Sequence, residues 1–194
     1  MTVKKKYSSG ATLIELMIAI AIFAIVVVMG IPSFRIFLEN GKIRNVTESI
    51  SNGMQKARLH AVQRNTNVAF YINAAGQTWG IYEWDTSLET PAWGAVETFN
   101  WSGRWPQISA TVAPANANTV SFSSVGRTLS SNPTGGGLPT GVTTIPIFRV
   151  DVAGALTGSG IYPLRVEVQS NAPSRGIRTC SPHLPATDPK GCVY

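Results

Sequence analysis

The stretch KKKYSSGATLIELMIAIAIFAIVVVMGIPSF, residues 4–34, decides how this chain is built. It begins with three lysines, and after Glu15 it contains no charged residue as far as Phe34. As an α-helix rising 1.5 Å per residue, the uncharged part would span about 30 Å, the thickness of a bilayer core. Because lysines favour the cytoplasmic side, we expect this segment to cross the membrane once, with the rest of the chain on the far side.

This segment differs from a secretory signal peptide, although it has the lysines and the apolar run of one. Residues 31–37, which follow the run, contain no small-residue pattern for cleavage. Small residues, Ser8-Ser9-Gly10, precede the run instead. A carboxylate such as that of Glu15 is costly in hydrocarbon unless a counter-charge accompanies it. Either Glu15 lies at the membrane interface by chance, or a partner supplies a positive charge.

The rest of the chain has the composition of one β-rich domain. The 194 residues include 18 Gly and 12 Pro, which favours many turns over a helical bundle. The net charge is +6, and removing the three lysines of residues 4–6 leaves +3, so composition alone does not indicate nucleic-acid binding. Apolar residues recur at helical spacing from Ile36 to Ala61, which predicts an amphipathic helix that packs one stripe on a sheet and ends near Asn65.

Beyond Asn65 the apolar pattern alternates, which predicts strands. One strand face carries Trp79 and Ile81, the other carries Tyr82 and Trp84, and one of these faces must pack on the helix. The aromatic segment 85–118 is expected to contain only short strands, and residues 131–141 a flexible loop. Strands are expected at 67–73, 78–84, 119–124, 144–152, 162–169 and 177–180, with a hairpin-like turn over 73–77.

The two cysteines, Cys180 and Cys192, lie close together near the end of the chain. Outside the cytoplasm they would form a disulfide, and closing so small a loop stabilises a fold by roughly 3 kcal/mol. The alternatives are two free thiols or half of a metal site. No matching cluster of Cys or His is visible, since His60 and His183 are far apart in the sequence. We expect no metal and no cofactor.

Residues Gly10 and Ala11-Thr12-Leu13-Ile14-Glu15 resemble the class III leader of type IV prepilins and type II secretion pseudopilins. In those families a membrane peptidase cuts after the glycine and methylates the new N-terminus, so the resemblance implies cleavage between Gly10 and Ala11 and methylation of Ala11. Ala11 departs from the phenylalanine that is usual at this place. The resulting ammonium could pair with Glu15 of an adjacent subunit and set the register of a filament. Pro32 lies where pilins carry a helix-breaking residue, in a segment that extends when subunits pack.

Two further segments, residues 55–68 and 119–127, resemble the GspH/FimT family of minor pilins and pseudopilins. The resemblance implies a pilin-like α+β fold, with one long N-terminal helix packed on an antiparallel β-sheet head domain. The four expected parts are the class III leader peptide (1–10), the transmembrane and assembly helix (11–34), the amphipathic helix (35–65) and the β-rich globular head (66–194).

On this resemblance the chain is a minor type IV pilin at a filament tip or initiation complex. It would contact membrane lipid before assembly, then the prepilin peptidase, the inner-membrane assembly platform, and other minor and major pilins. The precursor would span the bacterial inner membrane once, with its head in the periplasm, and the mature chain would lie in an extracellular pilus. The first alternative is a type II secretion pseudopilin in a periplasmic pseudopilus.

A second alternative is a pilin that binds DNA. The segment Arg175-Gly176-Ile177-Arg178 resembles a Gly-Arg-x-Arg motif of some FimT-type pilins, and only Arg178 holds a matching place. Together with Arg165 and Lys190, these arginines could form a salt-sensitive phosphate patch. The competing interpretation is a solvated basic edge that pairs with neighbouring subunits. A membrane-anchored enzyme is the third alternative, but no catalytic motif is visible, so we expect no enzymatic activity.

Overall fold

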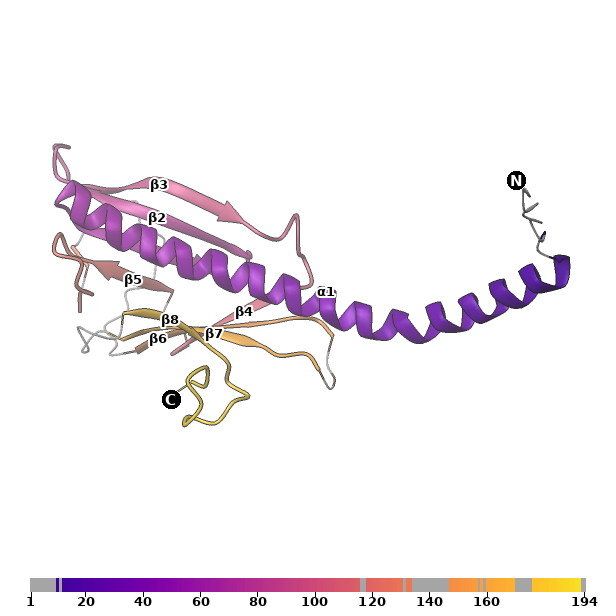
Figure 1. The fold of residues 1–194 in the computed structure, drawn as a ribbon. Helices are drawn as coiled ribbons and strands as arrows, with labels where there is room; N and C mark the ends of the chain where they lie inside the picture. The colour runs from indigo at the N-terminus through magenta and orange to yellow at the C-terminus, as the bar shows by residue number, and fades with distance from the viewer. Residues whose placement is uncertain are drawn as a thin grey trace, which may run out of the picture. The chain divides into compact units, whose positions relative to one another are not determined.

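The computed structural model describes residues 10, 12–115, 118–130, 132–133, 147–156, 158, 160–169 and 176–192. Two compact units divide the chain, residues 1–38 and 39–194. In the described part, one helix and eight strands form the fold (Figure 1). They are α1 (Leu13–Arg64), β1 (Val68–Asn73), β2 (Thr78–Asp85), β3 (Ala92–Asn100), β4 (Ser109–Ala113), β5 (Thr119–Phe122), β6 (Ile147–Ala153), β7 (Leu164–Gln169) and β8 (Ile177–Cys180).

Helix α1 is continuous over 52 residues, including Pro32 in its interior. Proline removes one backbone N–H donor, but it does not end the helix here. The helix ends at Arg64, and the next residue, Asn65, has a positive φ of 53°, a conformation that asparagine tolerates after a helix. In the first unit the apolar side chains of α1 are exposed to solvent. By length and composition alone, this stretch of α1 could cross a membrane.

The second unit is built on the other half of α1, where one stripe is buried. The apolar members of that stripe belong to the hydrophobic core. Trp79 on β2 donates from Nε1 to Ser49 Oγ of the helix at 3.1 Å, so the strand face of Trp79 and Ile81 is the one packed on α1. At Gly53 an added Cβ would lie 2.9 Å from Phe70 Cε2, so only glycine allows this close approach. The buried apolar residues of the stripe are Ile43, Val46, Ile50, Met54, Ala57 and Ala61.

The head contains two four-stranded antiparallel sheets rather than one. The first has the order β3-β2-β1-β5 and the second the order β4-β6-β7-β8. Both contribute to a single hydrophobic core with α1. The predicted fold class, a long helix packed on antiparallel β-structure, is confirmed, while the division into two sheets was not predicted. Parts of two expected elements, the strand at 144–152 and the loop at 131–141, lie outside the described residues.

The prediction of only short strands in residues 85–118 is wrong, because β3 is nine residues long. The register of β3 against β2 shifts between Ile81 and Tyr82, which is a β-bulge. Trp93 pairs with Trp84 and Phe99 pairs with Trp79, with ring centroids 5.2 and 5.6 Å apart. The bulge therefore places Trp93 and Phe99 on opposite faces, although residues six apart share a face in a regular strand. The bulge therefore interrupts the alternation of apolar and polar residues along the sequence of β3. Cross-strand aromatic pairs stabilise the strand.

Candidate functional site

The first candidate site is the start of α1, beside the proposed cleavage point. Thr12 is the N-cap, because its Oγ1 accepts a hydrogen bond from the backbone N–H of Glu15 at 3.3 Å. The sequence Thr12-x-x-Glu15 therefore has the spacing of a capping box. Gly10 is exposed and lies outside the helix, and Ala11 lies outside the described residues.

Capping alone does not explain why residue 15 is charged. A glutamine at this position completes a capping box as well as a glutamate does. Over the described ranges, the side chain of Glu15 makes no ion pair or hydrogen bond, and it is the one acidic group of α1 before Glu39. Its neighbours along the helix are exposed apolar side chains. Among the residues that the structure describes, the carboxylate therefore has no counter-charge. Pro32, the other predicted assembly residue, is exposed within the same apolar stretch.

The second candidate site is the charged face of the second sheet. Strand β6 contains Arg149-Val150-Asp151-Val152 and β7 contains Arg165-Val166-Glu167-Val168, two copies of one pattern. The antiparallel register places Asp151 opposite Arg165 and Glu167 opposite Arg149. The valines of both strands are buried in the core, so the charged residues point to the other face of the sheet. Strand β8 continues this face with Arg178, which pairs with Glu167.

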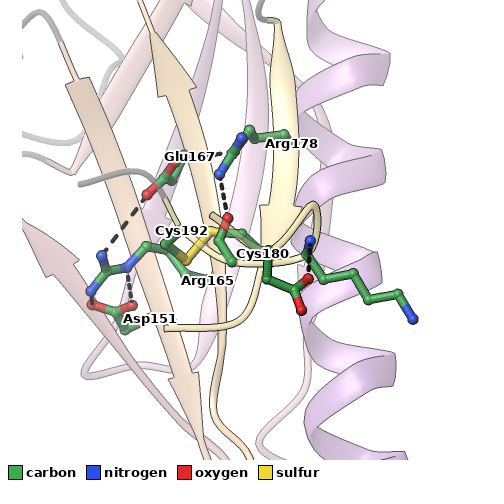
Figure 2. The surroundings of a disulfide bond; sticks show 9 residues. Asp151, Arg165, Glu167, Arg178, Cys180 and Cys192 are labelled. Carbon is green, nitrogen blue, oxygen red and sulfur yellow. Dashed lines mark hydrogen bonds and ion pairs between the residues drawn. A yellow bond between two sulfur atoms is a disulfide. The ribbon is translucent and has the colours of Figure 1, made fainter. Parts of the chain in front are cut away.

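Glu167 is the centre of this face and is completely buried. Its Oε2 lies 3.3 Å from Arg178 Nε, and its Oε1 lies 3.9 Å from Arg165 Nη1 (Figure 2). Neither oxygen of Glu167 accepts a hydrogen bond from a described residue, so its compensation comes from ion pairing. Removing a carboxylate from water costs several kcal/mol, which only nearby cations of good geometry offset.

Arg165 bridges two acids on neighbouring strands. It donates from Nε to Asp151 Oδ1 at 2.5 Å and from Nη2 to Asp151 Oδ2 at 3.1 Å, a two-pronged contact. The hydrogen bonds to Asp151 raise the pKa of Arg165 above its ordinary value, against the opposing effect of partial burial. Arg165 is therefore held in place by Asp151 while it also faces Glu167 (Figure 2).

The C-terminal segment covers this face and is attached to it by a disulfide. Cys180 on β8 is bonded to Cys192, with Cα atoms 5.1 Å apart. Arg178 donates from Nη2 to the carbonyl oxygen of Gly191 at 2.8 Å. The backbone N–H of Ser181 also donates to the carbonyl oxygen of Lys190 at 2.8 Å, which closes the loop. The disulfide thus holds the Gly191 carbonyl, which accepts from Arg178, beside the buried glutamate.

These contacts bear on the proposed phosphate patch. Arg165 and Arg178 are both engaged with acids or a backbone carbonyl, and their side chains are only 17% and 30% exposed. Lys190 is exposed on the covering loop, and Arg175 lies outside the described residues. The two described arginines are therefore brought together by Glu167 rather than displayed as an open cationic surface. Sequence reasoning missed Asp151 and Glu167, although the repeated Arg-Val-acid-Val pattern was a usable signal.

Three potential metal ligands also meet here. Donor atoms of Glu167, Cys180 and Cys192 lie within 4.8 Å of one another. Two of these atoms are the sulfurs of the disulfide, and a metal would require them as free thiolates. The arrangement therefore fits a covalent cross-link beside a buried acid.

Comparisons with known proteins agree with this architecture. Residues 5–31 match the prokaryotic N-terminal methylation motif, and residues 46–171 match the family described as type II transport protein GspH. No curated protein matches the sequence.

Two solved structures share the fold. The type IV minor pilin FimU of Pseudomonas aeruginosa has a TM-score of 0.51 and 12% identity, over 76% of this chain and 97% of that one. The minor pseudopilin EpsH from the Type 2 Secretion System of Vibrio cholerae has a TM-score of 0.50 and 10% identity, over 73% of this chain and 98% of that one. Identities this low show the fold alone, but the GspH match covers well over half of the sequence. This chain therefore belongs to the GspH family and carries the N-terminal methylation motif at its start.

Proposed function

We propose that this chain is a minor type IV pilin, a structural subunit without enzymatic activity. In this proposal the precursor is inserted in the bacterial inner membrane, cut between Gly10 and Ala11, and methylated at Ala11. The mature chain then joins a filament through the apolar half of α1. Membership of the GspH family, the methylation motif and the length of the apolar helix support this proposal.

The observation that carries the proposal is the carboxylate of Glu15, which has no compensating cation in the described part of the chain. An acid within an apolar helix is stable in hydrocarbon only when a positive charge lies nearby. After cleavage, the methylated amine of Ala11 in an adjacent subunit is a cation of the right kind, and Pro32 marks the segment that adapts as subunits pack. Partners in this scheme are the prepilin peptidase, the inner-membrane assembly platform, and other minor and major pilins.

The test separates the charge of Glu15 from its capping role. Glu15→Gln keeps the capping spacing and removes the charge, so we expect normal insertion and processing but loss of incorporation, at least about tenfold. The control is Glu48→Gln, which removes an exposed glutamate from the same helix that is paired with Arg44. Incorporation is measured by immunoblotting sheared surface filaments, and processing by N-terminal sequencing of the same material.

Two results would contradict the proposal. Normal incorporation of Glu15→Gln would remove the role of the charge, and a mature chain that still begins at Met1 would remove the processing step. Loss of incorporation by Glu48→Gln as well would show that the assay reports general damage to α1.

A second candidate is a pseudopilin of a type II secretion system, favoured by the structural match to EpsH. Both candidates share the proposed processing and assembly steps, so location separates them. Recovery of the chain in surface filaments supports the pilus, and retention in the periplasm with loss of secretion in a deletion strain supports the pseudopilin. We do not extend the proposal to DNA binding, because Arg165 and Arg178 are engaged with Asp151 and Glu167.

A further inference from the structure

An apolar groove of about 490 Å³ lies in the second unit, between α1, the turn after β5 and the start of β8. Leu59 and Val62 of the helix and Val125 of the turn line it, with Ile177 of β8. The first three side chains are 60%, 51% and 71% exposed. Exposed apolar side chains gathered around one hollow are typical of an interaction site, whereas single exposed ones are ordinary.

Arg58 supplies the cation of this groove. Its Nε lies 3.3 Å from the place where a Cβ of Gly126 would be, and its Nη1 lies 3.3 Å from the corresponding place at Gly176. The guanidinium of Arg58 therefore lies close to two residues without a side chain, Gly126 and Gly176. Among the residues that the structure describes, Arg58 makes no hydrogen bond or ion pair. No described residue accepts a hydrogen bond from its donors.

The two glycines keep this arrangement open. Gly126 has a φ of +73°, a conformation that other residues adopt only with strain. A Cβ there would also lie 3.1 Å from Val62 Cγ2. Larger residues at either position would therefore push on Val62 or on the guanidinium of Arg58. Among the described residues, the groove thus combines apolar walls with two glutamines, Gln55 and Gln63, and the guanidinium of Arg58.

This combination defines the ligand chemistry. A carboxylate suits the guanidinium, because arginine binds planar oxyanions with two parallel hydrogen bonds. The walls suit an aliphatic side chain next to that carboxylate. A nucleic acid fits less well, because single strands bind on aromatic platforms and none of the described residues that line the groove is aromatic.

We propose that this groove, the Arg58 groove, binds a protein segment of a neighbouring filament subunit that carries an aliphatic side chain beside a carboxylate. The identity of the partner as a filament subunit rests on the proposed function, whereas the ligand chemistry does not. The contact would join heads to one another, separately from the pairing of helices through Glu15.

The first experiment tests the chemistry with the full-length protein in detergent micelles. The probes are an acetylated and amidated pentapeptide with a central glutamate between two leucines, and its twin with glutamine. We expect the glutamate peptide to bind about tenfold more tightly, since a charge-assisted hydrogen bond contributes on that scale. Arg58→Gln should abolish the difference between the peptides, and Val125→Ser should weaken both.

The control variant is Arg44→Gln, which removes an arginine of the same helix that is paired with Glu48 and does not line the groove. It should leave both affinities unchanged. Absence of binding by both peptides, equal binding of the two, or persistent discrimination in Arg58→Gln would each overturn the proposal. Displacement of the glutamate peptide by equimolar single-stranded oligonucleotide would also overturn it, in favour of a nucleic-acid site.

The second experiment identifies the partner in cells. A photo-crosslinking amino acid at position 125 should join this chain to another filament subunit, and Arg58→Gln should reduce that adduct at least about fivefold. The same crosslinker at exposed Asn52, outside the groove, is the matched control. Filaments that form normally without any adduct at position 125 would overturn the groove and leave the proposed function intact. Glu15→Gln should abolish assembly while leaving peptide binding unchanged, so the two failures are distinguishable.

Discussion

The apolar half of α1 and the charged face of the second sheet each contain a glutamate, but they treat it differently. Glu167 is completely buried and lies beside Arg165 and Arg178 of its own chain. Glu15 lies among exposed apolar side chains and has no cation of its own chain near it in the described structure. A carboxylate that is paired with cations of its own chain contributes to the fold. A carboxylate without such a cation needs one from a partner when it enters hydrocarbon. Glu167 is thus compensated within the head, whereas Glu15 has no compensating cation among the described residues.

The largest expected effect on stability comes from Glu167→Gln. It leaves Arg178 and Arg165 facing a neutral amide in a covered site, and breaking a buried ion pair in this way costs about 3 to 4 kcal/mol. Guanidinium-induced unfolding of the full-length protein in micelles, followed by tryptophan fluorescence, measures this loss. All five tryptophans lie between residues 79 and 105, so their signal reports on the head.

The difference between the two glutamates would be contradicted if Glu15→Gln destabilised the head as much as Glu167→Gln does. We expect Glu15→Gln to change the free energy of unfolding by less than about 0.5 kcal/mol, as an exposed substitution does. We therefore expect the same Glu-to-Gln change to abolish filament assembly at position 15 and to destabilise the head at position 167.

The next effect concerns the C-terminal segment that covers the charged face of the second sheet. The double variant Cys180→Ala/Cys192→Ala frees the C-terminal segment that places the Gly191 carbonyl on Arg178. We expect a loss of about 2 to 3 kcal/mol, measured by the same unfolding assay, because a short loop is no longer closed in the unfolded chain. Wild-type protein treated with reductant should show the same loss, and unchanged stability in both would show that the cover contributes nothing to the face beneath it.

The smallest effect concerns a pair exposed to water. Arg44 and Glu48 form an i,i+4 ion pair at 2.8 Å on α1, with both side chains more than half exposed. Glu48→Gln should cost no more than about 0.5 kcal/mol, and the difference should vanish in high salt. A cost as large as that of Glu167→Gln would mean that burial does not set the value of these pairs, and would remove the basis of the comparison.

The predictable parts of the fold are those whose pattern is local. Helical spacing gave the buried stripe of α1, and alternation gave β1, β2 and β7 to within a few residues. Strand β3 was missed because a bulge against β2 breaks its alternation, and its aromatic pairs with Trp79 and Trp84 depend on register. The division into two sheets is equally a matter of long-range pairing, which propensity and periodicity do not encode.

The candidate site divides in the same way. The N-terminal methylation motif could be found because its residues are contiguous in sequence. Arg165 and Arg178 were grouped in the proposed phosphate patch, but their acidic partners were not found, because Asp151 and Glu167 meet them only through the register of β6, β7 and β8. The Arg58 groove was not predicted, since its walls come from three elements distant in sequence.

The start of α1 at Leu13 also affects how accessible the proposed cleavage point is to a protease. Gly10, which precedes the proposed cleavage point, lies outside α1, and the Thr12 cap follows it in the sequence. If the chain is cut after Gly10, as proposed, the cut would require no unwinding of α1 on the Gly10 side. A substitution that extended the helix back across residue 10 would place the proposed cleavage point within hydrogen-bonded backbone, and we expect it to slow the proposed cleavage.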